Sequence, residues 1–146
     1  MKLNQLSVFL ENKPGALSAP CRVLADANIN LQIISLADTR EFGILRAIVR
    51  EWEKAKRLLE KNGFTVKVTD VLALEVADRP GGLAEILEII ERANVNVEYT
   101  YAFPVRYRDK ALLIFRFNDT DAAIKALQAS NINVVGTVEL FKRLAD

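Results

Sequence analysis

The chain of 146 residues contains 51% apolar and 27% charged residues, a balance typical of a folded globular protein rather than a disordered one. Its net charge of +1 gives no general field to hold DNA or RNA, and the lack of histidine together with a single cysteine excludes a Cys/His zinc site. It has no apolar run of about 18 residues and no signal peptide, so we expect a cytoplasmic protein that does not enter a membrane.

The first half of the chain predicts six elements, in the order strand, helix, strand, strand, helix, strand. Pro14 suits the first turn of the first helix, because its missing N–H costs nothing there. That helix carries an apolar stripe at helical spacing and ends at Asn28, which tolerates a left-handed backbone. The expected elements are a strand over 6–10, a helix from Pro14 with Leu17, Cys21 and Leu24 facing inward, strands over 30–37 and 43–50, a helix over 52–62 and a strand over 64–68.

The second half predicts the same order. Asp119 is placed to cap the second of its two helices, and the basic residues at 106–110 predict a solvated hairpin turn. The expected elements are a strand over 71–77, a helix with Leu83, Ile86, Leu87 and Ile90 facing inward, strands over 95–103 and 111–117, a helix from Asp119 to about residue 130, and a strand over 134–138.

The two halves also repeat one sequence pattern. Residues 11–17 (ENKPGAL) align with 77–83 (ADRPGGL), and residues 27–30 (ANIN) align with 93–96 (ANVN). We therefore predict two domains, 1–70 and 71–146, each an α+β, ferredoxin-like βαββαβ unit with an antiparallel four-stranded sheet and two helices on one face. Units of about 70 residues have thin cores, so their bare sheet faces and edges need covering, which favours dimerisation or an enzyme partner.

The loop that begins at Asn12 has the chemistry of a small anion site. An Asx side chain usually accepts from the N–H two residues on, but here that residue is Pro14, so Asn12 needs a later partner or a ligand. The N–H groups of Gly15, Ala16 and Leu17 are then expected to be free donors at the positive end of a helix dipole, which suits a carboxylate. Asn30 adds an amide that can accept from an ammonium, and the two groups together describe an α-amino acid. The same residues also suit a strand-to-helix turn with no ligand.

The second loop differs in its charge. Asp78 takes the place of Asn12 and would repel a carboxylate, so we expect the two loops to be unequal and the first to be the binding loop. The spacing of the polar residues offers no nucleophile–base pair and no clustered carboxylates, so we expect no catalytic site, metal site or cofactor.

Together these motifs resemble the ACT domains, which are βαββαβ regulatory modules of amino-acid metabolism. The resemblance rests on residues 10–17 with 28–30 and on residues 78–83 with 95–96, and it covers nearly the whole chain in two copies. It implies amino-acid binding at an interface between units, through the loop before the first helix and the start of the second strand. Leu10 stands where serine-binding members often have histidine, which argues against serine. The implied ligand-binding residues are Asn12, Lys13, Pro14, Gly15, Ala16, Leu17 and Asn30 in the first copy, and Asp78, Gly81, Gly82, Leu83 and Asn96 in the second.

We therefore expect a non-enzymatic regulatory protein that binds a free amino acid and acts in trans on amino-acid metabolism. Its expected partners are the amino acid and either a second copy of the chain or an enzyme, joined through sheet edges, with no nucleic acid and no membrane. The alternative is a structural or regulatory subunit that pairs with an enzyme without binding a ligand itself. A domain of acylphosphatase-like activity would need an arginine-rich phosphate loop, which the sequence lacks.

Overall fold

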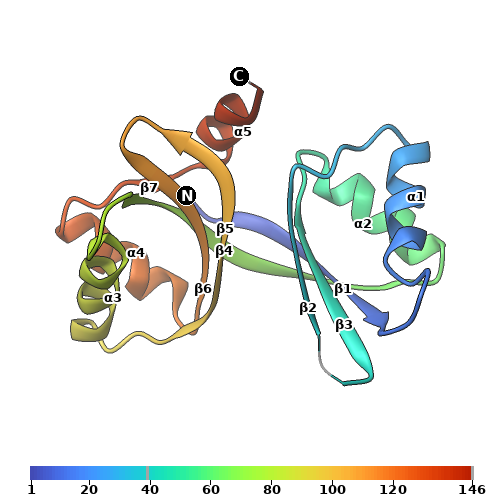
Figure 1. The fold of residues 1–146 in the computed structure, drawn as a ribbon, viewed down its shortest axis with the longest axis horizontal. Helices are drawn as coiled ribbons and strands as arrows, with labels where there is room; N and C mark the ends of the chain where they lie inside the picture. Colours follow the sequence, from blue (N-terminus) through green and yellow to red (C-terminus); the bar gives the residue numbers. More distant parts are fainter. Residues whose placement is uncertain (39, 146) are drawn as a thin grey trace. The chain divides into compact units, whose positions relative to one another are not determined.

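The computed structural model describes residues 1–38 and 40–145, which form two compact units. The first unit contains residues 4–69, and the second contains residues 1–3 and the chain from Asp70 onward. One long strand, β4 (Thr65–Ala77), runs through the boundary, so its residues up to Thr69 belong to the first unit. The elements of each unit are labelled in Figure 1.

The first unit contains β1 (Leu3–Glu11), α1 (Ser18–Asp26), β2 (Ile33–Asp38), β3 (Phe42–Ile48), α2 (Trp52–Lys61) and the start of β4. Its strands lie side by side in the order β2-β3-β1-β4, and β3 pairs antiparallel with both β1 and β2. Both helices lie on one side of this sheet (Figure 1). This is the βαββαβ order that the sequence predicts.

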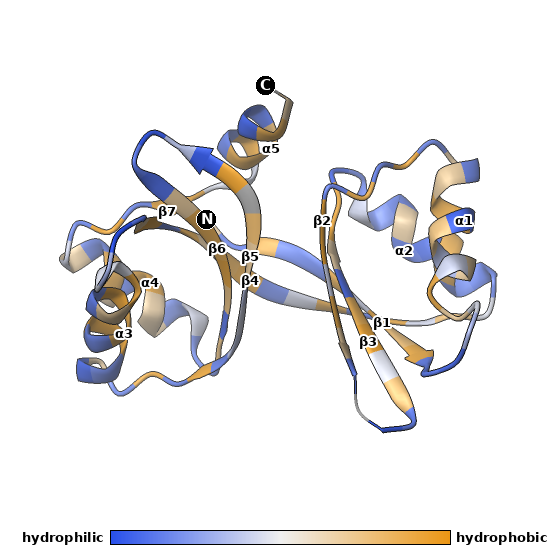
Figure 2. Ribbon diagram, in the orientation of Figure 1, coloured by the Kyte–Doolittle hydropathy of each residue, from blue (hydrophilic) through white to orange (hydrophobic). Residues whose placement is uncertain are grey.

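The core of the first unit lies between the sheet and these helices. Val8 is opposite Leu45 in the β1–β3 pair, so the two side chains share a face of the sheet. Ala55 and Leu59 are one helical turn apart on α2, and both are buried against that face. In Figure 2 the hydrophobic colour follows much of the strands, whereas the turns are mostly hydrophilic.

The second unit repeats this arrangement. After β4 come α3 (Gly82–Arg92), β5 (Val97–Tyr107), β6 (Lys110–Phe117), α4 (Thr120–Ala129), β7 (Val134–Val135) and α5 (Thr137–Ala145). β4 pairs antiparallel with both β6 and β7, and β6 with β5, which gives the order β7-β4-β6-β5. Its core contains the stacked rings of Phe115 and Phe117, whose centroids are 5.6 Å apart, together with Ile86 and Ile90 of α3.

The structure therefore confirms the predicted α+β fold class, and two local predictions at turns also hold. Asn28 has a φ of 57°, as expected for the left-handed residue after a helix. The Asp119 carboxylate accepts the Ala122 N–H at 3.0 Å and caps α4.

Four predicted elements differ from the structure in their limits. The first helix begins at Ser18 rather than Pro14, because Gly15 has a φ of +85°, which a right-handed helix does not contain. The strands predicted over 64–68 and 71–77 are the single strand β4, since no glycine or proline separates them. The strand predicted over 134–138 ends at Val135, and the helix α5 follows, closed at its start by the Leu140 N–H donating to the Gly136 carbonyl at 2.9 Å.

The inward faces of the first helix in each unit are also rotated from the predicted ones. α3 buries Gly82, Ile86 and Ile90, and leaves Leu83 and Leu87 exposed. α1 buries Pro20 and Leu24, leaves Leu17 exposed, and places Cys21 in an intermediate position rather than in the core. These exposed side chains leave apolar surface on the outer flank of each helix.

The helix α5 has no counterpart among the predicted elements, and it lies on the sheet face opposite α3 and α4. Glu75 stands between Leu74 and Val76 on β4, and these two neighbours face the core, so Glu75 points to the other face. There its carboxylate meets the Arg143 guanidinium of α5 at 2.7 Å, with both side chains less than 10% exposed. Figure 1 shows α5 beside the hairpin of β5 and β6, away from α3 and α4.

Charge pairing shifts the pKa of both partners in this contact. Burial alone would raise the pKa of the Glu75 carboxyl, but hydrogen bonds from Arg143 and Asn133 and the nearby cations outweigh burial, and the pKa lies below its ordinary value. Burial likewise opposes the charge on Arg143, yet Glu139 and Glu75 raise the pKa of its guanidinium. The pair is therefore charged in the folded protein at neutral pH.

No helix within the described residues is both long enough and apolar enough to cross a membrane.

We predict that Glu75→Gln destabilises the second unit in a pH-dependent way. The lowered pKa of Glu75 means that the ion pair stabilises the fold fully above the ordinary carboxyl value of 4.5, and loses that effect as the pH falls through the lower folded value. The variant should lose about 1–3 kcal/mol of unfolding free energy at pH 7, measured by urea denaturation with far-UV circular dichroism. The difference from wild type should shrink towards pH 3, and a difference independent of pH would contradict this role.

Candidate functional site

The first loop, residues 12–17, connects β1 to α1 and is open to solvent. Every residue in it except the half-buried Ala16 is exposed. The Asn12 side-chain amide donates to the Arg40 carbonyl at 3.4 Å, a long hydrogen bond to the neighbouring hairpin turn. Lys13 forms an exposed ion pair with Glu11 at 2.7 Å. This bond uses the amide nitrogen as donor, so it leaves open which partner the Asn12 side-chain oxygen takes in place of Pro14.

The donors that the sequence assigned to this loop are only partly available. The Ala16 N–H donates to the Lys13 carbonyl at 3.2 Å, so it is already engaged within the turn. The Ser18 hydroxyl donates to the Gly15 carbonyl at 3.1 Å, where the helix begins. The expectation of three consecutive uncommitted N–H groups after Pro14 is therefore wrong, because the turn closes on itself before α1 starts.

The second loop, residues 78–82, has the same backbone geometry. The glycine after proline again has a positive φ, +87° at Gly81 against +85° at Gly15. Three backbone hydrogen bonds recur at equivalent positions. The Asn12 N–H donates to Glu41 at 2.9 Å, as Asp78 does to Asp109 at 3.0 Å. Lys13 donates to Glu11 at 3.1 Å and Ala16 to Lys13 at 3.2 Å, as Arg79 does to Ala77 at 2.9 Å and Gly82 to Arg79 at 3.0 Å.

The side chains of the second loop are tied down by charge. The Asp78 carboxylate pairs with the Arg106 guanidinium at 2.9 Å. A cation therefore partly offsets the negative charge from which the sequence predicted repulsion of a carboxylate. Arg79 donates twice to the Glu85 carboxylate, at 2.7 and 2.9 Å, across the first turn of α3. The position of Glu85 is occupied by Ala19 in the first unit, so no carboxylate stands there. Both loops are largely exposed, but ion pairs engage two side chains of the second loop, Asp78 and Arg79, and only Lys13 in the first.

The second loop also has a tighter entry into its helix. A Cβ added at Gly82 would collide with the Ala77 backbone carbonyl, whereas the equivalent position in the first loop holds Ala16. Close backbone approach therefore explains the second glycine of the Pro-Gly-Gly sequence.

Each of the asparagines predicted to complete a site lies far from the loop of its own unit. Asn30 follows the C-terminal end of α1, and the first loop precedes its N-terminal end. α1 has nine residues, which corresponds to about 13 Å at 1.5 Å per residue. Figure 1 shows the two connections at opposite ends of this helix. The same holds for Asn96 and the second loop across α3, so neither unit brings its loop and its asparagine together.

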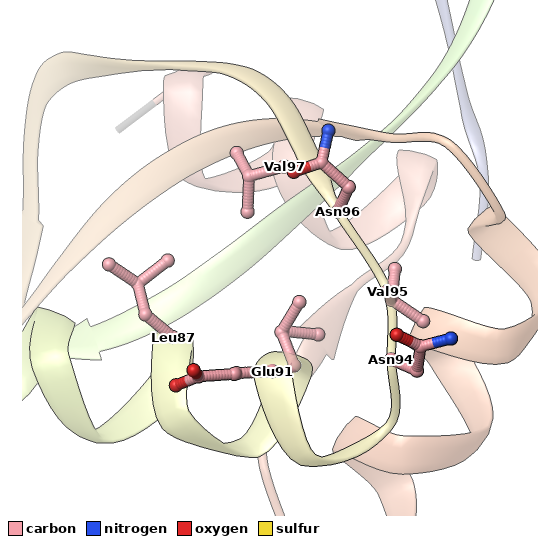
Figure 3. A pocket seen from close by; sticks show the side chains of 7 residues that line it. Leu87, Glu91, Asn94, Val95, Asn96 and Val97 are labelled. Atoms are coloured by element: carbon pink, nitrogen blue, oxygen red, sulfur yellow. The ribbon is translucent and has the colours of Figure 1, made fainter.

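Asn96 lies instead in a shallow hollow at the end of α3, shown in Figure 3. The hollow has a volume of about 410 Å³, within the size range of small-molecule sites. The start of β5 is fixed there, because the Asn96 N–H donates to the Asn118 side-chain oxygen at 2.9 Å and the Asn118 N–H donates back to the Asn96 carbonyl at 3.1 Å. The lining residues are Leu87, Ile90, Glu91, Asn94, Val95, Asn96 and Val97.

Leu87 and Glu91 reach this hollow from α3 and were missed by the sequence reasoning (Figure 3). Their spacing of one helical turn, just before Asn94, is the signal that places them beside the start of β5. The corresponding hollow of the first unit is smaller, about 230 Å³, and is lined by Asn28, Ile29, Asn30, Gln32, Arg50 and Glu51.

The outer edge of the first unit also carries apolar surface. A third hollow, of about 540 Å³, lies on the outer flank of α1 and is lined by small residues and Arg22. Ile34 and Leu36 of β2 are about half exposed, at 49% and 52%. Among the described residues β2 pairs only with β3, so it is an edge strand of the first unit.

No group of three or more histidine, cysteine, aspartate or glutamate side chains that could hold a metal ion occurs among residues 1–38 and 40–145.

Comparison with known proteins identifies the kind of chain to which these features belong. A family model described as an ACT domain pair matches residues 1–144. The small subunit of acetolactate synthase from Buchnera aphidicola subsp. Baizongia pistaciae (strain Bp) is 26% identical over 148 residues, covering 100% of this chain and 91% of that protein.

Two solved structures share the fold over most of the chain. The crystal structure of protein BT0572 from Bacteroides thetaiotaomicron has a TM-score of 0.89 and 37% identity, and covers 97% of both chains. The ligand-free regulatory subunit of aspartate kinase from Thermus thermophilus has a TM-score of 0.62 and 15% identity, and covers 86% of this chain and 91% of that one. The second likeness concerns the fold alone.

We predict that Gly82→Ala destabilises the second unit by about 1–3 kcal/mol, because the added methyl group overpacks against the Ala77 carbonyl. Gly136→Ala is the matched control, since nothing lies within 4 Å of a Cβ at that position. Urea unfolding followed by circular dichroism reports the loss, while fluorescence of Trp52, the only tryptophan, follows the first unit. Equal stability of the two variants would contradict the close approach.

Proposed function

The chain belongs to the ACT domain pair family, and from that premise we propose that it is a non-enzymatic regulatory protein that binds a free amino acid. It acts in trans, in the cytoplasm, on an enzyme of amino-acid metabolism. The observation that carries this proposal is the contrast between two loops with one backbone geometry: ion pairs hold Asp78 and Arg79 in the second, whereas a long hydrogen bond holds Asn12 in the first.

The first loop is the proposed receptor for the head group of the amino acid. Asn12 and the backbone of Gly15 are exposed there, and the long hydrogen bond from Asn12 to the Arg40 carbonyl can be exchanged for a ligand at little cost. Gly15 has no side chain to keep a carboxylate from the backbone, and nothing lies within 4 Å of its Cβ position. An amino acid of roughly 7–12 heavy atoms then binds with micromolar to millimolar affinity.

The site is completed by a second copy of the chain. β1 and β2 both run antiparallel to β3, so they point in the same direction. The last residue of β2 therefore lies at the side of the sheet where β1 leads into the first loop, and its first residue lies at the opposite side, next to Asn30. If two β2 edges pair antiparallel, the Asn30 end of one copy lies beside the loop end of the other. This arrangement supplies the amide that each unit alone cannot bring to its own loop. It also brings Ile34 and Leu36 of one copy close to the same residues of the other, because these exposed side chains project from one face of the edge strand.

The alternative is a subunit that pairs with an enzyme and binds no ligand itself. The similarity to an acetolactate synthase small subunit favours this reading, and it makes an acetolactate synthase catalytic chain the first partner to test. Exposed Phe9 and Phe42 on the first unit give such a partner an apolar contact.

We predict that one or a few of the twenty amino acids, each at about 5 mM, raise the melting temperature by about 2–5 °C through mass action. Asn12→Ala should abolish this shift without changing the melting temperature of the free protein, because the side chain is exposed. Asp78→Ala, at the equivalent position of the second loop, should leave the shift in place. A flat response to all twenty would favour the ligand-free alternative.

We also predict that the chain is a dimer and that Leu36→Lys weakens it at least tenfold, because like charges then meet across the paired edges. Sedimentation equilibrium measures the dissociation constant. Val138→Lys is the control, since Val138 is 84% exposed on α5 and lies in the second unit. Dimerisation unaffected by Leu36→Lys would place the interface elsewhere.

A further inference from the structure

The tip of the β5–β6 hairpin, residues 106–110, consists of the last residues of β5, the turn at 108–109 and the first residue of β6, and it contacts the second loop on one side. It is called the turn below. Arg106 pairs with the Asp78 carboxylate at 2.9 Å, and the Asp109 carbonyl accepts the Asp78 N–H at 3.0 Å. One side-chain contact and one backbone contact therefore hold the turn to the loop.

The same turn contacts α5 and its buried ion pair on the other side. The Arg143 guanidinium lies 4.2 Å from the centre of the Tyr107 ring, a cation–π contact. The Lys110 ammonium lies 3.5 Å from the Glu75 carboxylate, which is the partner of Arg143. On its own helix, the Arg143 guanidinium also donates to the Glu139 carboxylate at 2.8 Å.

We propose that this turn is a coupling element, which transmits changes in the second loop to α5 and so alters how firmly α5 is held on the sheet. Consecutive residues of a strand project to opposite faces. Arg106 and Tyr107 are neighbours on β5, so the contact of Arg106 with Asp78 and that of Tyr107 with Arg143 restrain the same short backbone segment. When Arg106 loses Asp78, the backbone that positions the Tyr107 ring beside Arg143 loses one of its restraints.

The local structure of β5 allows this movement. The pairing of β5 with β6 shifts register between Phe103 and Arg106, so the regular ladder is interrupted just before the turn. Arg108, within the turn, has a φ of 59°, in the left-handed region. On the β5 side, two residue pairs, Arg106 with Ala111 and Tyr107 with Lys110, join the tip to the sheet beyond this shift, and its contacts with the loop and α5 add to them.

The first unit shares only the backbone part of this connection, in which the Asn12 N–H donates to the Glu41 carbonyl at 2.9 Å. Phe9 occupies the position that aligns with Glu75, so the first unit lacks the carboxylate that anchors α5 in the second. The duplicated units have therefore diverged in role, with an open loop in the first and a loop connected to a terminal helix in the second. The use of α5 in regulation rests on the proposed function, whereas the connection between loop and helix does not.

Hydrogen–deuterium exchange on the full chain, without any added ligand, tests this connection. Asp78→Asn removes the charge and keeps the size of the side chain. Because an exposed ion pair contributes up to about 1 kcal/mol, the amides of α5 should exchange about three- to fivefold faster, with α4 and α2 unchanged. Unchanged exchange in α5 would overturn the proposal, and so would an equal increase in α4 and α5, which would indicate general loosening of the unit.

Variants of Tyr107 show whether the effect passes through the ring. In a Tyr107→Leu background, Asp78→Asn should accelerate α5 no further, because the link is already broken. In a Tyr107→Phe background, which keeps the ring, the three- to fivefold effect should persist. Equal effects of Asp78→Asn in both backgrounds would overturn the assigned route. None of these outcomes depends on amino-acid binding. The exchange data can therefore contradict the coupling while the proposed function stands, and the proposed function can fail while the coupling stands.

Discussion

The backbone of both units depends on one conformational constraint, the positive φ of the glycine after proline, +85° at Gly15 and +87° at Gly81. A residue with a side chain is strained in this region, so glycine allows the chain to turn sharply from the first strand into the first helix. That turn directs the N–H of Asn12 or Asp78 to the following hairpin, at Glu41 or Asp109, and sets the position of the helix on the sheet. The core then forms between that helix and the strands.

On this shared backbone, side-chain charge separates the two copies. The second loop has Asp78 with Arg106 and Arg79 with Glu85, and it is connected through the hairpin turn to a helix that lies on the opposite sheet face. The first loop has an amide and an exposed lysine, with alanine in the place of Glu85. An ACT pair built in this way divides two tasks between copies of one unit: the proposed ligand receptor lies in the first, and the proposed response element lies in the second.

Sequence reasoning found the fold because the signals it used are local and repeated. Apolar periodicity, the duplicated Pro-Gly loops and caps such as Asn28 and Asp119 are each decided within a few residues. It missed α5, since the valines before and after Gly136 have a strand-like composition, and burial of Arg143 on Glu75 depends on residues far apart in the chain. It did not foresee the ion pair of Asp78 for the same reason, because its partner Arg106 comes from a hairpin distant in the sequence. The separation of Asn30 from the first loop follows from topology and the length of α1 rather than from motif spacing.

The central claim is that the two loops are chemically unequal and that the first alone receives the ligand. The stoichiometry of binding, measured by isothermal titration calorimetry with an amino acid that stabilises the protein, tests this most directly. The account predicts one amino acid per chain, with Asn12→Ala removing all of the heat of binding. Two sites per chain, or a single site that survives Asn12→Ala and is lost with Asp78→Ala, would contradict it.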